Sequence, residues 1–205
     1  MFDRYANLIS AVDDTTGNSR PDTPYRIMEV GTYRGDHGLA MIKRALHKGR
    51  VDVRYTGFDL FEDLTQELAV KEKSKTKLPP SRDKVSKKMR EETAADIELW
   101  KGFTSKTLPA FVATTVKGVF WDLIYIDGGH ALETIDSDWN SVGPIIGPKT
   151  VVIFDDYYPD RDDFGCQQLI KRLKYDLAWK VEFLEPVDHY EHTKTTVQFV
   201  KVTRS

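Results

Sequence analysis

Two short apolar runs, Leu123–Ile126 (LIYI) and Val151–Phe154 (VVIF), each end abruptly in acid. Both are rich in β-branched residues and carry no charge, which is typical of strands buried on both faces of a parallel sheet. Asp127 follows the first run, and Asp155 and Asp156 follow the second. Because neighbouring strands of an open α/β sheet end at the ligand crevice, we expect the three carboxylates to converge there.

His130 lies one helical turn beyond Asp127, in the sequence DGGH. Like charges this close together are costly unless a cation neutralises them or one carboxylate takes up a proton. Carboxylate oxygens suit a hard divalent ion such as magnesium, manganese or calcium. A structural interpretation stays open, because an Asp that ends a strand often only caps the next helix, and His130 could also cap or lie at the surface. Four such residues at two adjacent strand ends favour the metal site.

Length and composition narrow the class of protein. The 205 residues suffice for one α/β domain with a sizeable core. Lys and Arg total 30 against 32 Asp and Glu, so the charge balance gives no indication of a nucleic-acid or membrane-surface partner. One cysteine, Cys166, excludes an internal disulfide framework and fits a reducing compartment. No run approaches the roughly 18 apolar residues of a membrane helix, and the first residues lack a secretory signal pattern. We therefore expect a cytoplasmic protein.

Residues 1–24 are expected to form an N-terminal extension to a single domain at 25–205. A short amphipathic segment, Phe2–Val12, precedes the polar stretch DDTTGNSRPDTP, whose Gly and Pro indicate a loop. The segment should pack on the edge of the domain or on another subunit, and the sequence leaves both open.

The first strand, Tyr25–Val30, leads directly into GTYRG, where Gly31 and Gly35 bracket a turn before a stretch with helical spacing. Glycine lets a ligand approach the main chain closely, and a strand, a glycine turn and a helix N-terminus together form a nucleotide-type site. The third glycine of the dinucleotide fingerprint is missing, which counts against a nicotinamide cofactor. An ordinary strand-to-helix turn is the alternative.

The second strand, Val53–Phe58, ends in Asp59, which lies 28 residues after Gly31. An acid at this place is positioned to accept hydrogen bonds from the two hydroxyls of a ribose. It could instead cap the next turn. The glycine turn and the acid support each other, because an adenosine-containing ligand requires both.

A third strand is expected at Ile97–Trp100, which places Gly102, Phe103 and Thr104 beside the adenine position. Phe103 is equally compatible with a core position. The preceding residues 62–95 are the most charged part of the chain and contain KEKSKTK. They predict either a solvated helical face or a charged helical lid that covers the crevice and favours an anionic substrate.

Two strands, Lys180–Leu184 and Thr195–Val202, are expected to close the chain. The loop between them, residues 188–192, contains His189 and His192 next to acidic residues. A second metal site is one interpretation of this loop, and a solvated hairpin tip is the interpretation that we favour.

Four motifs in chain order, EVGTYRG, FDLFED, YIDGGH and FDDYY, resemble the class I S-adenosylmethionine-dependent methyltransferases. Over residues 25–160 the chain is similar in particular to the branch that contains the macrocin-type sugar O-methyltransferases, with the cephalosporin hydroxylase-like proteins as relatives. The resemblance implies a Rossmann-like α/β fold with helices on both faces of a mostly parallel sheet of seven strands, the last of them antiparallel.

The same resemblance implies roles for individual residues. The expected cofactor-binding residues for S-adenosylmethionine are Glu29, Gly31, Thr32, Tyr33, Gly35, Asp59, Leu60, Gly102, Phe103, Thr104 and Asp127. Asp127, Asp155 and Asp156 match the magnesium ligands of the macrocin-type branch, and His130 matches the residue proposed there as general base. Asp127 and His130 are thus the expected catalytic pair. The sequence departs from the family in two respects. The lysine-rich segment 71–88 has no counterpart in the family, and the large N-terminal domain of some members is not seen in this sequence.

We therefore expect a magnesium-dependent O-methyltransferase acting on a small molecule, a sugar or glycoside hydroxyl. Neither a nucleic acid nor a membrane is expected as partner, and a homo-oligomer is compatible with the sequence. Two alternatives stay open: a metal enzyme of the hydroxylase-like branch, which would need an oxidant, and a non-catalytic module that binds S-adenosylmethionine. The sequence shows no N/D-P-P-Y/F motif, which disfavours a nucleic-acid methyltransferase. It leaves the acceptor molecule and the identity of the metal undetermined.

Overall fold

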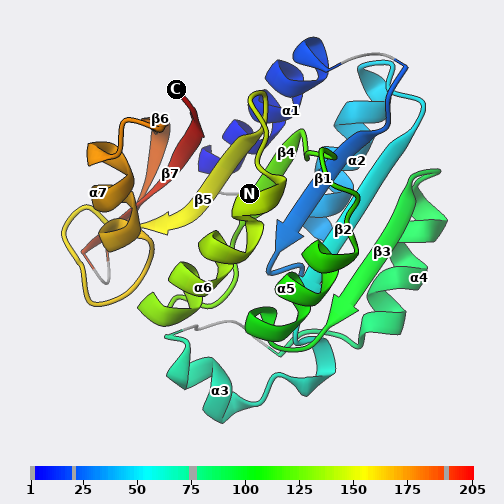
Figure 1. Cartoon of the computed structure of the whole chain (residues 1–205). Coiled ribbons are helices and arrows are strands. Elements are labelled where there is room, and N and C mark those ends of the chain that lie inside the picture. Colours follow the sequence, from blue (N-terminus) through cyan, green and yellow to red (C-terminus); the bar gives the residue numbers. More distant parts are fainter. Residues whose placement is uncertain (1–2, 20–21, 74–77, 192–193) are drawn as a thin grey trace.

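A computed structural model describes residues 3–19, 22–73, 78–191 and 194–205. In these residues one sheet has the strand order β3-β2-β1-β4-β5-β7-β6 (Figure 1). Its strands are β1 (Tyr25–Val30), β2 (Val53–Asp59), β3 (Asp96–Lys101), β4 (Leu123–Ile126), β5 (Val151–Tyr157), β6 (Trp179–Tyr190) and β7 (Thr195–Arg204). The first five run parallel, and β7 pairs antiparallel with both β5 and β6. The predicted fold class is confirmed.

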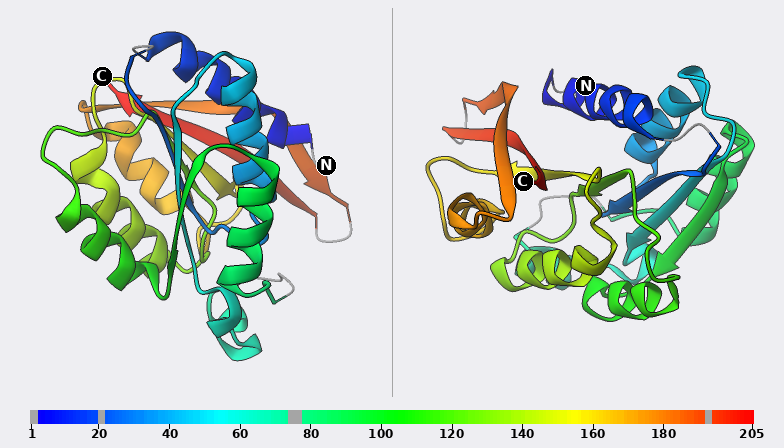
Figure 2. Two further views of the ribbon diagram at one scale, coloured as in Figure 1. Left: turned by 90° about the vertical axis from the view of Figure 1, so that its right-hand side faces the viewer. Right: turned by 45° about the horizontal axis from the view of Figure 1, so that its top comes forward.

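Helices cover both faces of this sheet (Figure 2). The described helices are η1 (Asp3–Tyr5), α1 (Ala6–Asn18), α2 (Asp36–His47), η2 (Phe61–Asp63), α3 (Gln66–Lys71), α4 (Arg82–Glu92), α5 (Thr104–Thr114), α6 (Leu132–Val142), η3 (Gly143–Ile145) and α7 (Gln167–Tyr175). Apolar residues of α1, α2 and α4 join one core cluster, and those of α5, α6 and α7 join the other. No helix among the described residues is both long and apolar enough to span a membrane.

The two central apolar runs are strands buried on both faces, as predicted. All four residues of β4 are buried, and alternate ones enter opposite cores: Ile124 and Ile126 on one face, Leu123 and Tyr125 on the other. Side chains of a strand point alternately to its two faces, so a strand between two helical layers needs apolar residues at every position.

The turn after β1 is held close to the end of β4. Gly31 has a φ of +96°, and a Cβ placed on it would overlap the carbonyl group of Asp127. The Asp127 amide donates to the Val30 carbonyl at 2.8 Å. Only glycine combines this backbone conformation with this approach, so Gly31 sets the spacing between the two strand ends.

The last two strands differ from the prediction. β6 runs to Tyr190 rather than ending at Leu184, and its pairing with β7 shifts register between Leu184 and Asp188. The irregularity carries the strand past Pro186, which the sequence pattern suggests as an end. His189 therefore lies within a strand, where its Nδ1 is 3.1 Å from the Thr196 hydroxyl oxygen, and His192 lies outside the described residues.

The N-terminal segment and the charged segment 62–95 take up different positions. α1 packs on α2, and η1 reaches β6. In the charged segment, α4 packs along β3 and buries Val85 and Met89, whereas α3 projects below the ends of the strands (Figure 1). Residues 74–77 of the lysine run lie outside the described residues.

Gly31→Ala tests the close approach between β1 and β4. The substitution adds both a strained φ and a clash with backbone, so we expect it to lower the free energy of unfolding by at least about 3 kcal/mol. Gly49→Ala is the matched control, because Gly49 has a φ of +87° but nothing lies within 4 Å of its added Cβ; its cost should be about 1–2 kcal/mol. Urea unfolding measures both, and equal costs would contradict the packing argument.

Candidate active site

A cavity of about 370 Å³ lies at the carboxyl ends of the parallel strands. Its size is within the roughly 300–1,000 Å³ usual for small-molecule sites. Eight of the predicted cofactor residues line it: Gly31, Tyr33, Asp59, Leu60, Gly102, Phe103, Thr104 and Asp127. They come from the ends of four strands, so the crevice is where the strand pattern places it.

Asp59 connects the glycine turn to the end of β2. One carboxylate oxygen accepts from the Tyr33 amide and the other from the Phe61 amide, each at 2.7 Å. Burial raises the pKa of Asp59 above its ordinary value, although these amide bonds act in the opposite direction. Each carboxylate oxygen has a second lone pair, so Asp59 both caps the next turn and can accept from ligand hydroxyls.

Three predicted cofactor residues lie behind the cavity rather than in its wall. Glu29 is fully buried and accepts from the Tyr55 hydroxyl. The Thr32 hydroxyl is 3.4 Å from the same Tyr55 hydroxyl, and Gly35 takes a left-handed conformation at the start of α2. These residues support the turn from beneath, and burial raises the pKa of Glu29 to about 8.

Further residues of the cavity wall could not be read from the sequence. They come from the segment around α3 and from the starts of α5 and α6: Leu64, Leu68, Lys71, Glu72, Pro79, Ser105, Gly128, Gly129, Glu133, Thr134 and Ser137, with Phe58 from β2. Glu72 ties two of these parts together, because its carboxylate accepts from Thr134 at 2.8 Å and its carbonyl accepts from the His130 amide at 3.0 Å. The α3 side of the charged segment therefore contacts the cavity.

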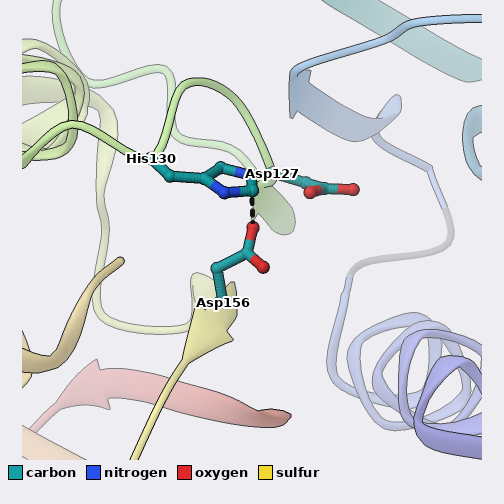
Figure 3. Close-up of side chains that lie close together, drawn as sticks. All are labelled: Asp127, His130 and Asp156. Carbon is teal, nitrogen blue, oxygen red and sulfur yellow. Dashed lines mark ion pairs between the residues drawn. The ribbon is translucent and has the colours of Figure 1, made fainter. Parts of the chain in front are cut away.

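Asp127, which lines the cavity, lies close to His130 and Asp156, which do not line it (Figure 3). One possible ligand atom from each lies within 4.8 Å of the others. His130 Nε2 is 2.8 Å from Asp156 Oδ2. Burial would lower the pKa of His130, but the Asp156 carboxylate outweighs burial and raises it. Burial likewise acts to raise the pKa of Asp156, and His130 reverses the effect, so that pKa lies below its ordinary value.

Both aspartates at the end of β5 lie near Asp127, and the strand is irregular there. Successive side chains of a regular strand point to opposite faces. Here the pairing of β5 with β7 shifts between Phe154 and Tyr157, and Asp156 has a φ of +58°. A local irregularity of this kind re-aims a side chain, and backbone strain concentrates at functional sites.

Asp155, predicted as a metal ligand, lies beside this group and is paired with Arg4. Arg4 Nε and Nη2 donate to its two oxygens, each at 3.1 Å. Burial and the neighbouring Asp156 raise the pKa of Asp155, against the effect of Arg4. Burial and then Asp155 and Asp156 raise the pKa of Asp127 well above its ordinary value. Arg4 was not predicted, since no local pattern links it to a strand end 151 residues away.

Aromatic rings lie next to Asp127, His130 and Asp156, which together are called the acidic group below. Tyr5 stacks on His37 with ring centroids 4.3 Å apart, and His37 Nδ1 is 3.9 Å from Asp127 Oδ2. On the other side Phe164 lies nearly parallel to His130 at 6.5 Å. The space next to the carboxylates is therefore walled by flat rings as well as by charge.

Residues 28–157, more than half of the chain, match a family model described as a methyltransferase domain. The chain belongs to this family. It is a class I S-adenosylmethionine-dependent methyltransferase. No curated protein matches the chain in sequence.

Solved structures share the fold of this methyltransferase. The O-methyltransferase NovP is 19% identical with a TM-score of 0.70, over 98% of this chain and 79% of NovP. CalS11, a TDP-rhamnose 3'-O-methyltransferase of calicheamicin biosynthesis, is 19% identical with a TM-score of 0.57, over 96% and 79%. A Thiobacillus denitrificans S-adenosylmethionine-dependent methyltransferase, solved with S-adenosyl-L-homocysteine, is 9% identical with a TM-score of 0.57, over 100% and 92%.

Glu29→Gln tests the burial of an acid behind the cofactor turn. With a pKa of about 8 in the folded chain against 4.5 normally, native Glu29 keeps a proton that the unfolded chain releases. Its contribution to stability is fully present below pH 4.5 and is lost as the pH rises toward 8. Glu29→Gln should therefore reduce the loss of stability between pH 5 and pH 8, by about a few kcal/mol.

Urea unfolding at the two pH values measures this difference. Glu91→Gln, an exposed glutamate of α4, is the control and should leave the pH dependence as it is. An unchanged pH dependence in Glu29→Gln would mean that Glu29 is ionised in the folded protein.

Proposed function

We propose that this methyltransferase transfers the methyl group of S-adenosylmethionine to a hydroxyl oxygen of a sugar or glycoside, with the help of a divalent cation. The observation that carries the proposal is the position of Asp127. It lines the cavity expected to hold the cofactor and also belongs to the group that can hold a metal ion. A methyl donor in the cavity and a hydroxyl at the acidic group would therefore meet at one residue.

The cavity suits S-adenosylmethionine. The close approach at Gly31 leaves main chain rather than a side chain in the wall, and the half-buried Asp59 carboxylate can accept from ribose hydroxyls. Phe103, which is 47% exposed at the cavity, offers an aromatic face to the adenine ring. These residues expected to bind S-adenosylmethionine thus lie at or just after the ends of three different strands, β1, β2 and β3.

The acidic group suits a divalent cation such as magnesium or manganese. Asp127 and Asp156 supply carboxylate oxygens, the preferred ligands of hard cations, and the His130 imidazole lies within 4.8 Å of them. The pKa of Asp127 is raised well above its ordinary value by burial and by the carboxylates beside it, and a nearby cation would relieve that repulsion. When bound, such a cation would act as a Lewis acid that orients the acceptor hydroxyl and lowers its pKa. Asp155 was also predicted as a ligand. Both of its carboxylate oxygens accept hydrogen bonds from Arg4, so this pairing determines whether Asp155 can bind the cation.

His130 is the residue proposed to remove the acceptor's proton. With Nε2 held by Asp156, Nδ1 is the nitrogen left to accept a proton, and it has no hydrogen-bond partner among the described residues. As the acceptor oxygen bonds to the methyl carbon, the carbon–sulfur electron pair returns to sulfur and the hydroxyl proton passes to His130. Asp156 orients the imidazole and stabilises the positive charge that forms on it.

A sugar is the acceptor class that the surroundings favour. The His37 and Phe164 rings lie close to the acidic group, and aromatic side chains beside carboxylates suit an acceptor with apolar C–H faces and several hydroxyls. The fold of CalS11, a TDP-rhamnose 3'-O-methyltransferase by its description, supports the same class.

Asp59→Ala tests the cofactor site by calorimetric titration with S-adenosylhomocysteine in the presence of magnesium. Loss of hydrogen bonds to a charged group should cost roughly 1.5–3 kcal/mol, so we expect affinity to fall about 10- to 100-fold. Asp63→Ala, an exposed acid four residues on, should bind like the unmodified protein. Thermal melting confirms that each variant is folded. No binding by the folded unmodified protein would contradict the cofactor class.

His130→Ala tests the proton acceptor in a methyl-transfer assay with a panel of free and nucleotide-linked sugars. Turnover should fall by roughly 100-fold or more, with little change in S-adenosylhomocysteine affinity. His47→Ala, an exposed histidine at the end of α2, is the control. In the same assay a chelator should abolish turnover and added magnesium should restore it. Activity that survives the chelator would remove the cation from the proposal, and a product that requires an oxidant would identify the hydroxylase-like alternative.

A further inference from the structure

Arg4 is a buried arginine whose guanidinium lies among the carboxylates at the end of β5. It is 5% exposed. Besides its two bonds to Asp155, it donates to Asp188, to the Tyr190 hydroxyl at 3.2 Å and to the Tyr5 hydroxyl at 3.2 Å. Every guanidinium nitrogen thus has an acceptor, in a fork geometry that matches a carboxylate. The N-terminal segment is thereby joined to β5 and to the far half of β6.

Asp155 has little capacity left for another ligand. Its Oδ1 accepts from Arg4 and, at 2.7 Å, from the Asp156 amide; its Oδ2 accepts from Arg4 and lies 3.2 Å from the hydroxyls of Tyr5 and Tyr125. A carboxylate offers about four lone-pair positions, and these are used. Asp127 instead accepts, within the described part of the chain, one hydrogen bond, from Tyr125 at 2.8 Å. The two aspartates differ in the room that they leave for a cation.

The charge of Arg4 also acts beyond its direct partner. The Arg4 guanidinium is bonded to both oxygens of Asp155, whose Oδ1 also accepts from the Asp156 amide at 2.7 Å. A positive group beside Asp155 and Asp156 repels a divalent cation that approaches the same carboxylates. The number of charged ligands is what tunes the affinity of oxygen sites for such cations.

We propose that Arg4 is a positioning residue that serves as the built-in counter-charge of Asp155. It keeps this carboxylate out of the set of metal ligands, leaving Asp127 and Asp156, and so weakens the affinity for the divalent cation. Through the same bonds it fixes the Tyr5 ring, which stacks on His37 with centroids 4.3 Å apart. This inference rests on the proposed function, which places a cation at Asp127 and Asp156.

A second arginine–aspartate pair in the chain joins two helices and serves as a comparison for Arg4. Arg44 on α2 makes a two-pronged pair with Asp13 on α1, with both distances 2.6 Å, away from the acidic group. Arg4 adds a third element, β6, and brings its charge to the strand ends, which a simple tether does not require. Arg44→Met is therefore the matched control for the loss of an N-terminal arginine–aspartate pair.

Manganese binding to the full chain tests the proposal, measured by electron paramagnetic resonance of free Mn²⁺ and by calorimetry. Arg4→Met releases Asp155 as a ligand and removes a repelling charge, so its Mn²⁺ affinity should rise by about tenfold or more. The double variant Arg4→Met/Asp155→Asn removes both charges and should return to within about threefold of the unmodified protein. Arg44→Met should bind Mn²⁺ like the unmodified protein.

Thermal melting with and without Mn²⁺ shows whether each variant is folded and reports metal binding as a rise in melting temperature. Arg4→Met leaves Asp155 buried and unpaired, so it should melt earlier than the unmodified protein and gain more from Mn²⁺. The double variant has no unpaired charge at residue 155, while Asp188 loses its Arg4 partner in both variants, so the double variant should melt later than Arg4→Met in the absence of metal. An Arg4→Met protein whose melting temperature does not respond to Mn²⁺ would overturn the proposal.

The outcomes separate this inference from the proposed function. Asp127→Asn should lose Mn²⁺ affinity by about tenfold or more. If the unmodified protein binds Mn²⁺ through Asp127 but Arg4→Met binds no more tightly, the role of Arg4 is overturned and the metal site stands. If Mn²⁺ binds to none of the folded variants, the metal site of the proposed function fails, and the inference fails with it.

Discussion

Three carboxylates meet at the ends of two adjacent parallel strands, and the repulsion between them governs how this face of the molecule is arranged. Asp155 is paired with the guanidinium of Arg4, and Asp156 with the imidazole of His130. Asp127 has no comparable partner among the described residues, and burial together with the two other acids raises its pKa. The carboxylate with the least support from a positive partner is thus the one that borders the cavity, and its ionised form is the one that a cation would stabilise most.

Backbone contacts, rather than side-chain contacts, fix the position of the acidic group relative to the cavity. Gly31 lies against the carbonyl of Asp127, and the Asp127 amide bonds back to Val30. These contacts join the turn after β1, which lines the cavity, to the end of the strand that leads into Asp127. Glu72 adds a second connection across the cavity, from the segment after α3 to the amide of His130. Methyl transfer requires in-line positioning, and rigid backbone contacts are suited to provide it.

The sequence predicted those features that local patterns encode. The buried strands β4 and β5 follow from uncharged, β-branched runs, and the cavity residues Gly31 and Asp59 follow from their places after strands. The extension of β6 was missed because a register shift carries pairing past Pro186, where composition indicates an end. Arg4 was missed because its partners lie 151 and 184 residues away, and no periodicity reports a contact of that separation.

The bonds of Arg4 also have a consequence for the order in which the chain assembles. Arg4 belongs to the first turn of the described chain, and Asp188 to its next-to-last strand. Contacts of such separation form late, because the entropy of closing long loops opposes them until the sheet is in place. A chain synthesised from its N-terminus therefore presents Arg4 long before the partners exist. Closure of the β6–β7 hairpin is the step that completes the charge balance of the acidic group, so the last strands to form decide when the site is finished.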